Sequence, residues 1–124
     1  MNNIRKAVPK DASRIAEIII TNYRMNFYPF FKNDEFYFDE LNVIDMAEDY
    51  KEGTDELNNT YVYDDDVVKG IIRIKGNEIE KLYVEPAFQS VGIGAQLLDF
   101  AVNEMGADFL WALEYNKRGI AFYR

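Results

Sequence analysis

Two turn signals divide the middle of the chain into short apolar segments, and they restrict the fold more than any other feature. The first signal is the acidic run 64–66, and the second is Gly76-Asn77. The segments around these signals are 60–63, 67–74 and 78–84. Valine, isoleucine and tyrosine recur in them, as is typical of strands. Because such short turns join antiparallel neighbours, the sequence predicts a three-stranded antiparallel meander.

Segments with helical spacing flank this meander on both sides. Before it, we expect a strand over 4–8, a helix over 11–23 and a helix over 39–51. After it, we expect a helix over 92–105, an apolar strand over 109–113 and a helix from residue 116. Asp11 can cap the first helix. Leu41, Ile44 and Ala47 would share one face of the second.

These elements define a topology. The helix between the strands 78–84 and 109–113 is a crossover, which implies that these two strands are parallel. The expected order is β-α-α-β-β-β-α-β-α, in one domain over residues 1–124. The fold class is α/β (α+β in the stricter sense), with a mixed antiparallel and parallel sheet flanked by helices.

Composition excludes several kinds of chemistry. The chain contains neither cysteine nor histidine. Disulfides, thiolate metal sites, cysteine nucleophiles and histidine bases are therefore impossible, and we expect no metal. No apolar run has the length of a signal peptide or a membrane span. We accordingly expect a cytoplasmic protein with no membrane partner.

Charge is concentrated in one part of the sequence. Residues 34–66 contain thirteen acidic side chains and a single basic one, Lys51, whereas the whole chain has a net charge of −8. Such a block repels nucleic acid, so we expect no nucleic-acid partner. It is either a solvated acidic face or an environment that attracts a cationic acceptor such as an amine.

The segment 84–95 has the pattern of an anion-binding turn. A strand ends at Val84, and a Gln-x-x-Gly-x-Gly run over 89–94 leads into a helix. Glycine allows close approach of the backbone to a ligand, and a helix N-terminus offers unpaired N–H groups to an anion such as a pyrophosphate. By itself the pattern also fits a helix cap or a tight helix–strand contact. A Rossmann or P-loop site does not fit, because neither glycine spacing is present.

Two neighbouring runs make this pattern more specific. Leu82-Tyr83-Val84 precedes the turn, and Leu113-Glu114-Tyr115-Asn116 with Phe122-Tyr123 follows it. The start of the chain, Ile4-Arg5-Lys6-Ala7 with Pro9 and Asp11-Ala12, fits the same pattern. Together these runs resemble the GNAT superfamily of acetyl-CoA-dependent N-acetyltransferases over essentially the whole chain. The resemblance implies the GNAT acyl-CoA N-acyltransferase fold, with the chain ending before the family's C-terminal pair of strands.

The resemblance also implies a set of cofactor-binding residues for acetyl-CoA. They are Leu82, Tyr83, Val84, Gln89, Ser90, Val91, Gly92, Ile93, Gly94, Ala95 and Asn116. The backbone of 82–84 would bind the acetyl carbonyl and pantetheine, and Asn116 the pantetheine arm. Family members often have Arg or Lys where this chain has Ser90 and Val91, so its phosphate binding would depend on backbone N–H groups.

The same resemblance suggests catalytic residues. Tyr123 matches the tyrosine that protonates the departing thiolate, and its alternative is a core aromatic paired with Phe122. Glu78 and Glu80 share one strand face and are candidates for the general base, as is Glu114; each is otherwise a surface charge.

Eight aromatic residues gather over 23–38, where the family places its acceptor-side helices. We expect most of them to cover the sheet. The alternative is that they form the wall of an acceptor pocket.

The resulting hypothesis is acetyl transfer to an amine acceptor, either a small molecule or a peptide amine. The alternatives are a catalytically degenerate GNAT-fold module that binds CoA or a partner protein, and a small domain with no ligand. The 109–113 strand would be an open apolar edge. A homodimer is the favoured way to cover it, and a helix or loop of the same chain is the alternative.

Overall fold

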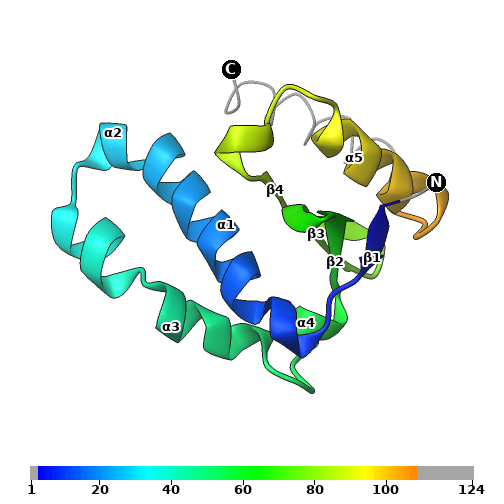
Figure 1. Cartoon of the computed structure of the whole chain (residues 1–124), viewed down its shortest axis with the longest axis horizontal. Helices are drawn as coiled ribbons and strands as arrows, with labels where there is room; N and C mark the ends of the chain where they lie inside the picture. Colours follow the sequence, from blue (N-terminus) through cyan, green and yellow to red (C-terminus); the bar gives the residue numbers. More distant parts are fainter. Residues whose placement is uncertain (1–2, 109–124) are drawn as a thin grey trace.

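The computed structural model describes residues 3–108, which form one antiparallel sheet with helices on both faces (Figure 1). The strands are β1 (Ile4–Lys6), β2 (Thr60–Asp65), β3 (Val67–Lys75) and β4 (Glu78–Val84). They are ordered β1-β2-β3-β4, and each neighbouring pair is antiparallel. The predicted meander is therefore confirmed. The strand predicted over 109–113 and the helix from residue 116 lie outside the described residues.

Helices occupy most of the first half of the chain. The α-helices are α1 (Ala12–Asn26), α2 (Tyr28–Phe31), α3 (Val43–Ala47), α4 (Asp55–Asn58) and α5 (Ile93–Asn103). The other helical turns are the 3₁₀ turns Pro9–Asp11, Glu48–Tyr50 and Pro86–Phe88 and the π turn Phe36–Glu40. Among the described residues, no helix is long and apolar enough to cross a membrane.

The sheet separates two apolar cores. Strand alternation sends Val62 and Ile71 to the α1 face, where Ile15, Ile18 and Ile19 pack. On the other face, α5 covers residues from β3 and β4. The buried members of this second core include Ile72, Ile74, Ile79, Leu82, Val84, Ile93, Leu97 and Ala101. Figure 1 shows α1 and α5 on opposite sides of the strands.

Asp11 has a different role from the predicted helix cap. Its carboxylate makes no side-chain cap bond to α1. It accepts hydrogen bonds from the Val8 N–H and from two nitrogens of Arg5, at 2.8 and 3.0 Å. Burial alone would raise the pKa of Asp11, but the Arg5 guanidinium and the Val8 N–H hold this pKa below its ordinary value. The prediction was wrong because the strand before the helix supplies better donors than the helix itself.

The single helix predicted over 39–51 is also wrong. The side chain of Asn42 accepts from the Asp45 N–H at 2.9 Å, so a new helix starts at Val43 and ends at Ala47. Ile44 is 79% exposed, and Met46 packs toward the α1 core instead. Helix α4, whose first turn is capped by Thr54, was not predicted.

Candidate functional site

Strand β4 is one of the two edge strands of the described sheet, the other being β1, and it contains a bulge. Ile74 pairs with Ile79 and Arg73 pairs with Lys81, which leaves Glu80 without an opposite residue. A bulge of this kind increases twist and redirects the residues that follow it. Beyond it, Leu82 and Val84 are buried on the α5 side, whereas Tyr83 packs toward the α1 core.

The loop from Glu85 to Gly92 joins β4 to α5, and its backbone is partly left-handed. Ser90 has φ 70° and Gly92 has φ 89°, in the region that favours glycine. The first intrahelical bond of α5 runs from the Gln96 N–H to the Gly92 carbonyl, at 3.1 Å. The N–H groups of residues 93–95 therefore form the open N-terminal turn of the helix, which suits an anion.

Gly70 on β3 determines how closely α5 approaches the sheet. A Cβ atom at this position would lie 3.1 Å from a side-chain atom of Ile93 and 3.2 Å from one of Leu97. A larger residue would require the side chains of Ile93 and Leu97 to shift. Gly94, in contrast, would make only ordinary contact with Val84, at 3.8 Å.

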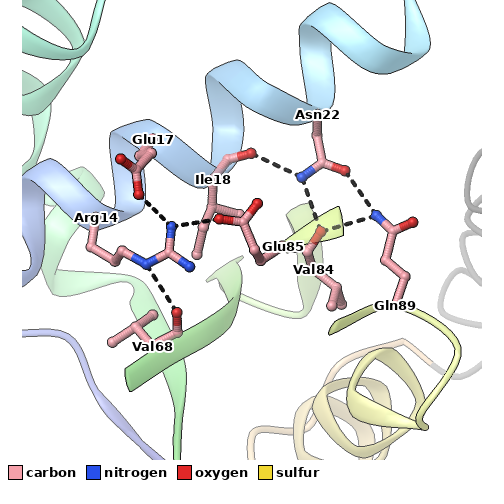
Figure 2. Close-up of polar contacts among 8 residues, drawn as sticks. All are labelled: Arg14, Glu17, Ile18, Asn22, Val68, Val84, Glu85 and Gln89. Carbon is pink, nitrogen blue, oxygen red and sulfur yellow. Dashed lines mark hydrogen bonds and ion pairs between the residues drawn. The ribbon is translucent and has the colours of Figure 1, made fainter. Parts of the chain in front are cut away.

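The side chain of Gln89 points into the protein (Figure 2). Its amide nitrogen donates to the Val84 carbonyl at 3.0 Å and to the Asn22 side-chain oxygen at 3.4 Å. Asn22 lies on α1, is 1% exposed, and donates to the carbonyls of Ile18 and Val84 at 2.9 and 3.1 Å. Gln89 thus anchors the loop from within.

A second link joins α1 to the end of β4 (Figure 2). Arg14 donates from Nη1 to Glu85 at 2.8 Å and from Nε to the Val68 carbonyl at 3.1 Å. Nη1 also lies 2.6 Å from Glu17. Through Asn22, helix α1 thus bonds to Val84 at the end of β4. Through Arg14, it also bonds to Glu85, the residue that follows.

Besides Arg14, a lysine lies beside the loop. The Lys69 ammonium is 4.8 Å from the centre of the Phe88 ring and 3.2 Å from an oxygen of Asp65. The Lys69 carbonyl accepts from the Glu85 N–H at 2.9 Å. The sequence pattern did not identify this residue, because it comes from β3 rather than from the loop.

The predicted general-base candidates lie in different surroundings. Glu80 accepts from Arg73 at 3.1 Å, and Arg73 also donates to the Tyr50 hydroxyl at 2.9 Å. Tyr50 is buried, and this burial raises its pKa. Glu78 is exposed at the first position of β4, paired across the sheet with Lys75. Glu114, Asn116 and Tyr123 lie outside the described residues.

A tyrosine–lysine cluster occupies the α1 face of β4. Lys81 donates to the Tyr23 hydroxyl at 2.8 Å, and the Tyr23 ring packs edge-on against Tyr83. Tyr23 thus links α1 to the strand whose backbone the family resemblance assigns to the acetyl carbonyl and pantetheine.

The other aromatic residues of the 23–38 stretch mostly do not cover the sheet. Among them only Tyr37 is buried, whereas Phe30 is 81% exposed and Phe31, Phe36 and Phe38 are also exposed. Tyr28 packs edge-on against Tyr37 and Phe38. The expectation that most of them cover the sheet was wrong, because the short turns carry them past its edge (Figure 1).

Asn22 and Arg14 were missed, although Asn22 left a signal. It continues the apolar stripe of α1 formed by Ile15, Ile18 and Ile19, where a polar residue requires a buried partner. No comparable signal marks Arg14, which is a common type of residue on an outer helix face. Among the described residues, no group of acidic side chains is arranged to hold a metal ion.

Comparison with known proteins gives one family and several related folds. The family model described as "Acetyltransferase (GNAT) domain" matches residues 56–124, more than half of the chain. No curated protein matches significantly. A crystal structure from Rhodopseudomonas palustris, titled "GCN5-Related N-acetyltransferase: Aminotransferase, Class-II", is similar with a TM-score of 0.66 and 20% identity. The match covers 95% of this chain and 80% of that one.

A second similar structure is the PaiA N-acetyltransferase from Thermoplasma acidophilum, crystallised in complex with coenzyme A. Its TM-score is 0.55 and its identity is 21%, over 83% of this chain and 70% of that one. At these identities the two structures demonstrate a shared fold.

Proposed function

The chain belongs to the GNAT acetyltransferase family, and we propose that it transfers an acetyl group from acetyl-CoA to an amine. The reaction is direct attack of the amine on the thioester. It requires a site for the pyrophosphate of the cosubstrate, donors for the oxyanion and groups that move protons.

The observation that supports this function most directly is the geometry of the 85–92 loop. Two left-handed residues, Ser90 and Gly92, turn the chain at the end of the loop, and α5 begins at Ile93. The N–H groups of the first helical turn then point to one place, and the helix dipole makes that place favourable for a phosphate. We assign the pyrophosphate to these N–H groups, and Lys69 adds a positive charge beside the loop.

The reacting end of the cosubstrate would lie along β4. We propose that the backbone at 82–84, just past the Glu80 bulge, binds the acetyl carbonyl and pantetheine. Asn116 would bind the pantetheine arm, and Tyr123 would protonate the departing thiolate; both assignments rest on the family resemblance. Glu78 and Glu80 remain the candidates for accepting the proton of the amine.

We propose a cationic amine acceptor, a small molecule or a peptide. Two features of the described residues support it. The segment 28–58, which packs beside α1, is rich in exposed carboxylates, including Asp34, Glu35, Asp39 and Glu40. Exposed aromatic rings lie among them, and such rings can pack against the carbon chain of an amine.

The test is a pair of matched glycine variants. Gly92 and Gly53 both have φ near 90°, and a Cβ atom at either position would meet nothing within 4 Å. Valine at either site should therefore cost a similar roughly 1–2 kcal/mol of backbone strain. We expect Gly92→Val to weaken coenzyme A binding by more than about tenfold, because the N–H groups move. Gly53→Val should leave the affinity unchanged.

Calorimetry with coenzyme A measures both variants. For the wild-type protein, ligand at about 100 times its Kd should add roughly 2.7 kcal/mol of stability. Absence of binding to the wild type would refute the proposed function. Acetyl-CoA turnover with a panel of amines completes the test, because binding without turnover of any amine would favour the CoA-binding module instead.

A further inference from the structure

We propose that Asn22 is a positioning residue for the 85–92 loop. Its side-chain amide fixes Gln89 to the last carbonyl of β4, and so determines where the N–H groups of α5 lie. This inference rests on the proposed function, since the ligand affected is coenzyme A.

The burial of Asn22 is the first step of the argument. It is 1% exposed on an otherwise apolar helix face, packed over the sheet. An amide in such a place is costly unless its donors and acceptor are all bonded. Its own helix satisfies only one of them, through the bond to the Ile18 carbonyl. The remaining bonds leave α1 and reach the end of β4 and the loop.

These bonds close a ring of three groups (Figure 2). The Val84 carbonyl accepts from Asn22 at 3.1 Å and from Gln89 at 3.0 Å, which uses both of its lone pairs. Gln89 in turn donates to the Asn22 oxygen at 3.4 Å. Such a ring holds the strand end, the loop and α1 in one relative position. Loss of Asn22 leaves Gln89 with a single acceptor in the ring, the Val84 carbonyl, and without its bond to α1.

The position of Gln89 in the loop gives this ring its consequence. The left-handed residues Ser90 and Gly92 follow directly, and Ser90 is not glycine, so its backbone is strained. Strained conformations persist only when both ends are held. The α5 end is held by the close packing of Ile93 and Leu97 on Gly70. Asn22 and Gln89 hold the other end.

The experiment compares Asn22→Ala with Ile19→Ala. Both residues are about 1% exposed on α1, but Ile19 packs in the apolar core and has no bond to the loop. Both variants should lower the Tm. Only Asn22→Ala should weaken coenzyme A binding, by on the order of tenfold, measured by calorimetry at a temperature where both variants are folded. Ile19→Ala should bind within about twofold of wild type, since its loss is distributed through the core.

Hydrogen exchange without any ligand provides the second readout. Amides of residues 89–95 should exchange faster in Asn22→Ala than in Ile19→Ala when the two are compared at equal global stability. Unchanged loop exchange and unchanged affinity in Asn22→Ala would overturn the inference. If the wild type bound no coenzyme A, the proposed function would fail, and the exchange data would still decide whether Asn22 holds the loop.

Gln89→Leu tests the same contact if Asn22→Ala does not fold, and a double variant tests whether the two residues act together. Gln89→Leu removes the same contact from a half-buried position and should weaken binding to a similar extent. The combination with Asn22→Ala should be no weaker than the poorer single variant, because both break one ring. Wild-type affinity in a folded Gln89→Leu protein, or strictly additive losses, would contradict the proposal.

Discussion

Residues 67–103 and residues 28–58 are held together by different forces. In the first region, β3 and β4 pair along their length with one bulge at Glu80, and α5 lies on them through buried aliphatic side chains. In the second, the longest helix has five residues, and the structure depends on side-chain contacts. Arg24, for example, donates to the Tyr37 carbonyl at 2.7 Å and lies 4.8 Å from the centre of the Phe38 ring.

The contrast separates a scaffold from a variable surface. Cooperative backbone bonding and a shared core fix the region that presents the 85–92 loop. The 28–58 segment has few buried side chains and many exposed charges, so its exposed residues can change at little cost to the sheet. This division suits the proposed reaction, which combines one cosubstrate with a selected acceptor.

The largest expected effect is the loss of unfolding free energy when a core residue of the first region is truncated. Ile71 on β3 is fully buried beneath α1, so Ile71→Ala should lower the free energy of unfolding by about 2–5 kcal/mol. Ile44→Ala, on exposed α3, should change it by less than about 0.5 kcal/mol. Denaturant unfolding of both variants measures the two values. A cost for Ile44→Ala that approaches that for Ile71→Ala would remove the distinction between the regions.

The same difference explains what the sequence could predict. In 60–103, alternation, turn residues and helical spacing all agree, and the observed strands and α5 match the predictions to within two residues at each end. In 39–58, the spacing of Leu41, Ile44 and Ala47 suggested one long helix. Side-chain cap bonds at Asn42 and Thr54 instead begin two short helices, and the spacing of apolar residues does not reveal such bonds.

The site was predictable only in its local part. The loop and its glycines could be recognised because their pattern is continuous in sequence. Asn22 lies 62 residues from Val84 and 67 from Gln89, so its partners depend on how α1 crosses the sheet. Likewise, the exposed aromatic rings could not be distinguished from core residues before the turns that carry them were known.

An intermediate effect is expected from ion pairs and pH. The pKa of Asp11 is lowered in the fold, so its contribution to stability is present above its unfolded pKa of about 3.9 and is lost as pH falls through the folded pKa. Asp11→Asn should lower the free energy of unfolding by about 1–3 kcal/mol near pH 7. The difference between the variant and the wild type should become smaller below about pH 4. Urea unfolding of both proteins between pH 7 and 2 measures this difference in the free energy of unfolding.

The matched control comes from the 28–58 segment. Glu48 and Lys51 form an exposed ion pair one helical turn apart. Glu48→Gln should cost at most about 0.5 kcal/mol at pH 7, because exposed pairs of this kind are well solvated. If the free energies of unfolding of Asp11→Asn and wild type differed by the same amount down to pH 2, the charged form of the Asp11 carboxylate would not be the form that Arg5 stabilises.

The smallest effect on stability is expected at the exposed aromatic residues, where the functional effect should be largest. Phe30 is 81% exposed on α2 and Ile44 is 79% exposed on α3, so alanine at either position should leave the free energy of unfolding within about 0.5 kcal/mol of wild type. Phe30 is one of the exposed rings over residues 30–38 that, with the carboxylates beside them, we assign to the amine acceptor. Phe30→Ala should therefore raise KM for amines with a long carbon chain by a few-fold, while coenzyme A affinity stays constant.

Ile44→Ala, away from those rings in sequence, should leave both constants unchanged. Steady-state kinetics with short and long amines measures the effect, and equal KM values for both variants across the series would exclude Phe30 from the acceptor site.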